Sequence, residues 1–328
     1  MENDVPLLKA MMSDMALQKS IYQPGPYWQK YADKKYAYIL ENGISEFRKD
    51  TFISKGFGDS PINDPAVFWE KSGTNKAKVK KVLRTLPFFR NMFADYQRYI
   101  DSLINTKRSL QSNLIEIEYG NAIRELDPPV GLSEGCETTL NINGTTYSEL
   151  YIEHVKRIIN SREHVPFEEC ETMMEIGGGF GANIHILLNC YPNIKRVYYI
   201  DIPPVLYVGT QYLRSIFGDM VKDYRAGTVF SQEREILCLA PWQIEQCLPV
   251  DLFWNAASFA EMPVETVRNY GNFIDAKHYC IIMSGGNPDA ASGRSSPAIL
   301  EEALGKKLKK VEEFLGGGYF VLDRELPK

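Results

Sequence analysis

The stretch of residues 175–181, Glu-Ile-Gly-Gly-Gly-Phe-Gly, constrains the fold of this chain more than any other feature. It places four glycines directly after the apolar run Thr172-Met173-Met174. The residues that follow carry Ile184, Leu187 and Leu188 at helical spacing. The sequence therefore predicts a strand, a glycine loop and a helix in succession.

Three interpretations of this loop compete. A turn without a ligand needs only one or two glycines, and each further glycine has an entropic cost. The spacing of Gly177, Gly179 and Ala182 also satisfies the dinucleotide fingerprint G-x-G-x-x-G/A. Asp201 lies roughly 20 residues further on, where an acid that binds a ribose would end the second strand. By itself this spacing does not distinguish a dinucleotide from another adenosine cofactor.

Glu175 favours the third interpretation, S-adenosylmethionine. In a dinucleotide enzyme the pyrophosphate sits over the loop, and a carboxylate beside it would face a doubly anionic group. The corresponding part of S-adenosylmethionine is an amino acid and a positively charged sulfonium. A carboxylate beside this part of the ligand helps binding. The stretch resembles motif I of the class I methyltransferases, and residues 197–201, Val-Tyr-Tyr-Ile-Asp, look like their second strand ending in the ribose acid. Under this resemblance the cofactor residues are Glu175, Gly177, Gly178, Gly179, Gly181 and Asp201.

Composition limits the possible partners. The chain has 328 residues, of which 44% are hydrophobic and 24% charged, so it is long enough for two cores. A net charge of −5 argues against a nucleic-acid partner. No apolar run approaches the length of a membrane span, and the N-terminus lacks the apolar core of a signal peptide. The six cysteines include no C-x-x-C pair, which is typical of a reducing compartment and predicts a cytoplasmic protein.

The front of the chain has the pattern of helices. Apolar residues recur at helical spacing within residues 7–15, 28–39 and 88–104, and Asn42-Gly43 is a natural helix end. A short helix with Phe68 and Trp69 is expected after Asp64-Pro65. We predict a helical N-terminal domain at 1–130, serving as a substrate cover or as a homo-oligomer contact. A hairpin turning at Asn143-Gly144 and a helix around 150–159 then lead into a cofactor-binding domain at 131–328.

The second half alternates strands and helices in the pattern of a doubly wound sheet. Strands are expected at 172–174, 196–200, 235–239, 250–254 and 279–283, followed by 309–314 and 319–323. The last two look like the terminal antiparallel hairpin that distinguishes methyltransferase sheets from dehydrogenase sheets. The predicted fold class is therefore α/β, a Rossmann-like methyltransferase sheet behind a mostly helical N-terminal region.

The candidates for chemistry lie where strands end, because ligands of open parallel sheets bind beyond the carboxyl ends of the strands. Glu261 follows the fourth strand and is predicted to be the general base or to orient a hydroxyl; the alternative is an N-terminal helix acid beside Pro263. Asn255 and Ser258 are the predicted substrate contacts. His278 precedes its strand and would lie at the wrong end of the sheet, and His154 would lie outside it. No Asp/His set has the spacing of metal ligands, so we predict no metal.

The longer pattern resembles the bacterial family of sugar O-methyltransferases. The resemblance is carried by Tyr27-Trp28, Phe68-Trp69, the motif at 174–181, Tyr199-Ile-Asp-Ile-Pro-Pro204 and Asn255-x-x-Ser258-x-x-Glu261-Met262. It implies methyl transfer from S-adenosylmethionine to a hydroxyl of a nucleotide sugar, a glycan or a glycosylated metabolite. Two alternatives stay open at this point, a nicotinamide-dependent oxidoreductase and a methyltransferase for a non-sugar small molecule.

Overall fold

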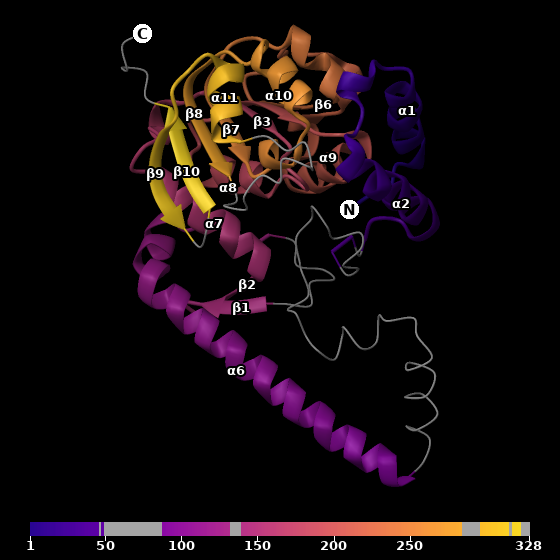
Figure 1. Ribbon diagram of the computed structural model, residues 1–328, viewed down its shortest axis with the longest axis vertical. Coiled ribbons are helices and arrows are strands. Elements are labelled where there is room, and N and C mark those ends of the chain that lie inside the picture. Colours follow the sequence, from indigo (N-terminus) through magenta and orange to yellow (C-terminus); the bar gives the residue numbers. More distant parts are fainter. Residues whose placement is uncertain (46, 49–86, 132–138, 284–295, 315–316, 323–328) are drawn as a thin grey trace.

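A computed structural model describes residues 1–45, 47–48, 87–131, 139–283, 296–314 and 317–322. Its centre is an eight-stranded sheet in the order β5-β6-β4-β3-β7-β8-β10-β9 (Figure 1). The strands are β3 (Thr172–Ile176), β4 (Arg196–Ile200), β5 (Val221–Lys222), β6 (Glu235–Leu239), β7 (Val250–Ala256), β8 (Ala276–Met283), β9 (Lys309–Phe314) and β10 (Gly317–Leu322).

Apolar residues fill both faces of this sheet. Along β3, Met173 belongs to one hydrophobic cluster and Met174 to the other, and Tyr199 and Tyr198 divide in the same way along β4. Strands that are buried on both faces have continuous apolar runs in their sequence, rather than an alternation of apolar and polar residues. This is why β6 and β7 are apolar along almost their whole length and could be recognised in the sequence.

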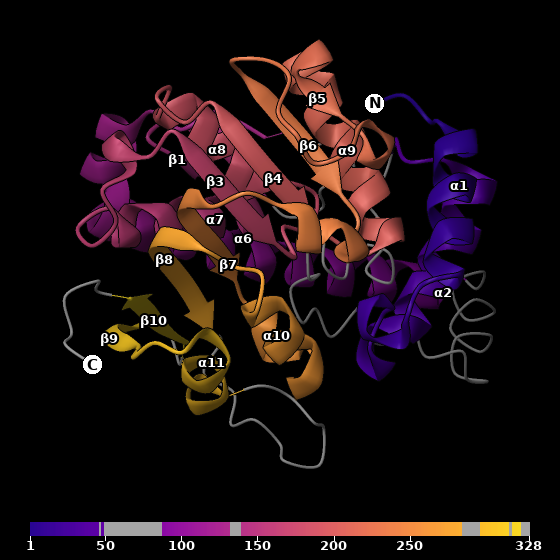
Figure 2. The ribbon, with the colours of Figure 1, turned by 90° about the horizontal axis from the view of Figure 1, so that it is seen from above.

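Helices cover the two faces. The first cluster includes residues of α7 (Glu149–Ser161), α8 (Ala182–Cys190) and α9 (Pro203–Phe217). The second includes residues of α10 (Val264–Gly271) and α11 (Pro297–Leu304), which lie near β7 and β8 in Figure 2. Six short 3-10 helices complete the described elements: η1 (Ser20–Tyr22), η2 (Phe167–Glu169), η3 (Gly218–Met220), η4 (Tyr224–Ala226), η5 (Pro241–Gln246) and η6 (Phe259–Glu261).

The far edge of the sheet decides the fold class. Strand β10 pairs antiparallel with both β8 and β9, whereas β5, β6, β4, β3, β7 and β8 run parallel. A dehydrogenase sheet of order 3-2-1-4-5-6 would instead end in a sixth parallel strand. The prediction of a methyltransferase-type sheet with a terminal antiparallel hairpin is confirmed.

The N-terminal region contains α1 (Val5–Ala16), α2 (Pro26–Asn42) and the 40-residue α6 (Pro87–Leu126). Helix α6 extends away from the sheet in Figure 1, and its last turns pack on the hairpin β1 (Thr139–Ile142) and β2 (Thr145–Ser148). Helix α1 packs on α9, and Leu7, Leu8 and Met11 share the first cluster with the sheet. A separate domain at 1–130 stays a prediction, since these buried residues of α1 add to the core of the sheet.

Most expected elements are present, with two additions. The sequence analysis missed the two-residue edge strand β5 and helix α11. Such a short strand offers no periodicity, and Pro297 opens α11 after a stretch with no apolar pattern. The expected helix with Phe68 and Trp69 lies outside the described residues.

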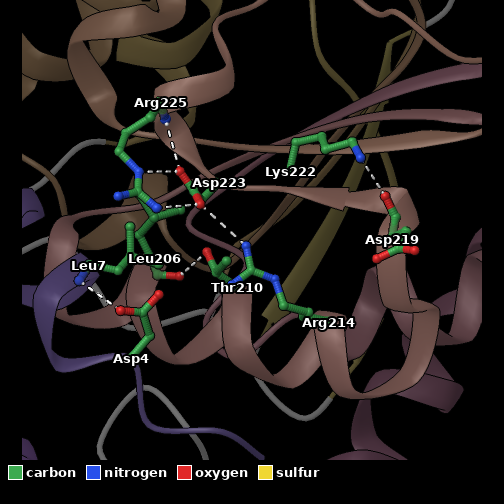
Figure 3. Close-up of polar contacts among 9 residues, drawn as sticks. All are labelled: Asp4, Leu7, Leu206, Thr210, Arg214, Asp219, Lys222, Asp223 and Arg225. Carbon is green, nitrogen blue, oxygen red and sulfur yellow. Dashed lines mark hydrogen bonds and ion pairs between the residues drawn. The ribbon is translucent and has the colours of Figure 1, made fainter.

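Charged side chains hold the edge of the sheet on α9 (Figure 3). Asp223 accepts hydrogen bonds from Arg225 at 2.9 Å and from Arg214 of α9 at 3.3 Å. Nearby, Asp4 caps α1 by accepting from the Leu7 amide at 3.0 Å. The contact of Arg214 with Asp223 ties α9, whose first turn follows Asp201, to the segment after β5.

Tyr199 couples α9 to the glycine loop. Its hydroxyl donates to the carbonyl oxygen of Gly179. A Cβ on Gly209, in the middle of α9, would lie 2.1 Å from the same hydroxyl oxygen. The helix can therefore approach β4 this closely only because residue 209 has no side chain.

We expect Gly209→Ala to destabilise the protein by about 1–3 kcal/mol, the usual cost of overpacking a core. The sign is opposite to the gain that alanine gives in an unconstrained helix. Urea unfolding would measure it. Gly120→Ala in α6 is the matched control, because its Cβ would meet no atom closer than 3.3 Å. Equal stability of Gly209→Ala and the parent would contradict the close packing of α9 on Tyr199.

Candidate cofactor and active site

A cavity of about 330 Å³ lies at the carboxyl ends of β3, β4 and β7. Four parts of the chain close it: the glycine loop, one face of α7, the segment from β7 to α10, and residues 23–28 at the start of α2. The lining side chains that bear on the argument are Trp28, His154, Arg157, Asn183, Asp201 and Glu261. The strand ends predicted to carry the chemistry thus do meet at one cavity.

The glycines of the loop are needed mostly by the protein itself. Gly177, Gly179 and Gly181 have φ values of 73°, 63° and 90°, which side chains disfavour. A Cβ on Gly177 would lie 2.3 Å from Ser258, and one on Gly178 would lie 2.8 Å from the Glu175 carboxyl. Internal packing therefore accounts for part of the glycine pattern that the sequence analysis attributed to a ligand.

Asp201 ends β4 at the cavity wall. Its Oδ2 accepts from the Gly179 amide at 3.0 Å and its Oδ1 from the Ile202 amide at 2.7 Å. Burial raises the pKa of this carboxyl to about 7, although both amides and the charge of Lys35 oppose the rise. Asp201 is therefore an oriented acceptor facing the cavity, where the sequence predicted one.

Lys35 of α2 was not identified from the sequence. Its side chain is fully buried, and burial lowers the pKa of its ammonium to about 7 against the pull of Asp201. A lysine in an aromatic-rich helix has no local signal that it reaches a strand end some 165 positions away. The N-terminal region thus adds a wall to the cavity and a buried amine that acts on Asp201.

Glu175 lies behind the cavity rather than in it. Its side chain is fully buried, and Oε1 accepts from Asn183 Nδ2 at 2.6 Å. Oε2 has no hydrogen-bond partner among the described residues. Burial raises the pKa of this carboxyl to about 8, and the Asn183 hydrogen bond only partly opposes the rise.

Asn183 connects Glu175 to His154. The Nδ1 atom of His154 lies 2.7 Å from Asn183 Oδ1. The sequence analysis set His154 aside because it precedes the sheet, yet α7 brings it to the cavity. The signal that could have found it is the spacing of Leu150, His154 and Arg157, which places all three on one face of the helix.

The two predicted substrate contacts hold the loop after β7. Asn255 is fully buried and donates to the Ile176 carbonyl at 2.9 Å and to Ser258 Oγ at 2.7 Å, while its Oδ1 accepts from the Phe259 amide at 3.2 Å. Ser258 lines the cavity, but its hydroxyl donates to the Ile176 carbonyl at 2.8 Å. This network positions the segment that carries Glu261.

Glu261 ends the short helix η6 and lines the cavity together with Met262 and Trp28. It is partly exposed, as a group that meets a ligand must be. His278 lies opposite Leu252 near the start of β8, away from the carboxyl ends, as expected. Of the predicted residues, Asp201, Gly177, Gly178, Gly179, Ser258 and Glu261 line the cavity, whereas Glu175, Gly181 and Asn255 stand behind it.

In the described part of the chain, no three His, Cys, Asp or Glu side chains come together as ligands of a metal would. Nor does any helix within the described ranges combine the length and apolar character that crossing a bilayer requires. The expectation of a metal-free site stays a prediction.

Part of the chain is similar to O-methyltransferases in sequence. The O-methyltransferase domain family matches residues 139–234, from the β1-β2 hairpin to the residue before β6. Norreticuline-7-O-methyltransferase of Papaver somniferum is 26% identical over 183 residues, covering 54% of this chain and 46% of that enzyme. The chain thus spans about half the length of this curated relative. The family match at residues 139–234 covers His154, Glu175 and Asp201 but ends before Asn255, Ser258 and Glu261.

Solved structures of methyltransferases match about half of this chain with low TM-scores. The mitomycin 7-O-methyltransferase MmcR is 16% identical with a TM-score of 0.38, over 54% of this chain and 55% of that one. Human N-acetylserotonin methyltransferase in complex with SAM is 14% identical with a TM-score of 0.34, over 53% and 57%. At these values the likeness carries no argument about activity.

The raised pKa of Glu175 predicts a pH-dependent stability. The folded protein keeps the carboxyl proton up to about pH 8, whereas the unfolded chain loses it near pH 4.5. Stability from this group is therefore lost as the pH rises between these values. Glu175→Gln keeps an acceptor for Asn183 but does not titrate. Because one pKa unit corresponds to about 1.4 kcal/mol and 1 kcal/mol to roughly 2–4 °C, the parent's Tm should fall at least about 2 °C more than the variant's between pH 5 and pH 9.

Thermal melts in a buffer series of constant ionic strength would measure this difference. The charge of Asp201 also acts on Glu175, so the comparison is repeated in an Asp201→Asn background, where this second carboxyl is removed from both proteins. Parallel Tm curves would mean that Glu175 is ionised at neutral pH in the folded protein.

Proposed function

We propose that this chain is an S-adenosylmethionine-dependent O-methyltransferase. The observation that carries the proposal is the Asp201 carboxylate, held on the Gly179 amide at the carboxyl end of β4 and facing the cavity. When bound, the cofactor supplies a methyl group activated on a sulfonium. The chain's part is to hold that cofactor and a hydroxyl acceptor in line, an arrangement that by itself accelerates transfer strongly.

The residues fit the adenosine part of this cofactor. An ionised carboxylate offers about four lone-pair sites, and the two backbone amides use two of them. Two acceptor positions remain on Asp201, as many as the two hydroxyls of a ribose require. A cavity of about 330 Å³ lies at the lower end of the range of about 300–1,000 Å³ for small-molecule sites.

The oxidoreductase alternative has less support. A dehydrogenase sheet would lack the antiparallel hairpin formed by β9 and β10. Calorimetry with S-adenosylmethionine, S-adenosylhomocysteine and NAD side by side tests the choice. Binding of NAD in preference to both sulfur compounds would overturn the proposal.

Asp201→Asn should weaken S-adenosylhomocysteine binding by about 1.5–3 kcal/mol, the range for hydrogen bonds to a charged group. The substitution keeps the shape of the side chain and one acceptor oxygen. Calorimetry would measure the affinity, and a thermal melt would establish that the variant is folded. Asp275→Asn, an exposed acid before β8, is the matched control. Unchanged affinity in a folded Asp201→Asn protein would remove Asp201 as the ribose acid.

For the acceptor we propose a sugar hydroxyl, on a nucleotide sugar, a glycan or a glycosylated metabolite. Supporting this choice are the resemblance carried by the 255–262 segment and the presence of Trp28 and Glu261 at the same cavity. A sugar hydroxyl is too weak an acid to ionise freely at neutral pH. Glu261 is therefore the proposed base, which takes the proton as the new carbon–oxygen bond forms. Ser258 and Asn255 hold its segment in place.

A phenolic hydroxyl is the second candidate. The relative from Papaver somniferum is named for O-methylation of norreticuline, and the rings of Trp28, Phe180 and Tyr270 line the cavity of this chain. A phenol ionises near pH 10 and needs less help from a base than a sugar hydroxyl does. A panel of nucleotide sugars and simple phenols, assayed for methyl transfer, would decide between them.

Glu261→Gln should lower turnover with a sugar acceptor by about 10²–10⁴, the usual contribution of a general base. The affinity for S-adenosylhomocysteine should stay unchanged, because the substitution keeps shape and one acceptor. Steady-state kinetics and calorimetry measure the two quantities. Glu265→Gln, an exposed acid in the first turn of α10, is the matched control. Turnover close to that of the parent would leave Glu261 only an orienting role.

A further inference from the structure

We propose that helix α7 binds the amino acid end of the cofactor, with His154 accepting a hydrogen bond from the ammonium group and Arg157 pairing with the carboxylate. This inference rests on the proposed function, because it assumes S-adenosylmethionine as the ligand. It assigns a site to residues that precede the sheet and that the glycine motif does not include.

One face of α7 is built into the cavity. Leu150, His154 and Arg157 line it, while Val155 and Ile158 of the same helix are fully buried in the core. The helix is fixed at its start by Ser148, whose hydroxyl oxygen accepts from the Tyr151 amide at 3.3 Å. It also packs along α8, the helix that follows the glycine loop. The two polar side chains therefore project from a rigid element.

The contact with Asn183 determines which hydrogen-bonding role His154 plays. The Asn183 amide donates through Nδ2 to Glu175, so its oxygen is the atom that faces the imidazole. An amide oxygen only accepts, and Nδ1 of His154 must therefore carry the hydrogen. Nε2 is left with a lone pair, and no described residue bonds to it. His154 thus offers the cavity an acceptor.

The imidazole also stays neutral. Burial, with the nearby charge of Arg157, lowers the pKa of His154 to about 3. A neutral ring cannot attract an anion, but it can accept from a cationic donor such as an ammonium group. Glu175 does not reach the cavity itself. Its influence passes through Asn183 to His154, and it is a positioning residue in this scheme.

Arg157 supplies the complementary charge. A guanidinium stays protonated at all working pH values and forms strong paired bonds with a carboxylate. Residues three apart on a helix have Cβ atoms about 5–6 Å from one another. An acceptor and a cation at that separation match an ammonium and a carboxylate attached to the same carbon. The glycine loop and the start of α8 together connect the two ends of the site, since Gly179 bonds to Asp201 and Asn183 of α8 bonds to His154.

Three ligands that differ only at the amino acid end test the inference by calorimetry. They are S-adenosylhomocysteine, its decarboxylated analogue, and 5′-methylthioadenosine, which lacks the whole amino acid end. In Arg157→Met the affinity for S-adenosylhomocysteine should fall by about 10- to 150-fold, while the affinities for the other two stay within about twofold. In His154→Leu the first two ligands should both weaken and methylthioadenosine should not.

Arg162→Met, at the end of the same helix and paired with Glu125, is the matched control and should change none of these affinities. If Arg157→Met does not fold, Arg157→Lys replaces it, and if His154→Leu does not fold, His154→Gln replaces it. Each of these conservative variants should lose less affinity for S-adenosylhomocysteine than is expected for the variant it replaces. If a variant weakens the binding of all three ligands equally, or of none, the inference is overturned. The proposed function then still stands, provided that the parent protein binds S-adenosylhomocysteine. A parent protein that binds none of the three overturns the proposed function and, with it, this inference.

Nitrogen-15 NMR of the histidines gives a second readout that needs no ligand. His154 should show the Nδ1–H tautomer and no imidazolium down to about pH 5, as its lowered pKa requires. Asn183→Leu should abolish the preference for that tautomer. A protonated Nε2 in the parent protein would remove the acceptor from the cavity and overturn the inference.

Discussion

The turn between β3 and α8 is the constraint on which the rest of the site depends. Its backbone lies so close to Glu175, Ser258 and Leu213 that a Cβ at Gly177, Gly178 or Gly181 would collide with one of them. The Gly177 amide donates to the Ile200 carbonyl at 2.8 Å, and the Gly179 amide donates to Asp201. The loop is thus fastened to the end of β4, which places the Asp201 carboxyl and the loop amides at the same cavity.

Several ionisable groups around this cavity are held near or in their neutral forms. Burial raises the pKa of Glu175 to about 8 and of Asp201 to about 7, and it lowers the pKa of Lys35 to about 7 and of His154 to about 3. Removing charged groups from water is costly unless a partner compensates. A ligand that carries a sulfonium, an ammonium, a carboxylate and two ribose hydroxyls brings partners for each kind of group. In the proposed function the protein is therefore prepared for a ligand with charges of both signs.

The N-terminal region contributes to the same cavity rather than standing apart from it. Residues 23–28 close one side, Lys35 acts on Asp201, and α1 shares the core of α9. An acceptor bound beside Trp28 and Glu261 would meet both halves of the chain. In the proposals made above, the glycine loop and α7 bind the cofactor, and the segment after β7 acts on the acceptor.

The sequence by itself determined the sheet, because a parallel sheet covered on both faces requires apolar runs and each run is local. It also predicted that the glycine loop, Asp201 and Glu261 lie at the carboxyl end of the sheet, since residues that follow strands can be placed once the strands are known. It could not determine which side chains face the cavity and which lie behind its wall. Glu175 and Asn255 lie at the carboxyl ends of strands, where ligands of parallel sheets bind, yet both lie behind the wall of the cavity. The reason is that the direction of a side chain depends on its packing partners. His154, Arg157 and Lys35 reach the cavity from helices outside the sheet, and only the tertiary structure decides which face of a helix meets a distant loop.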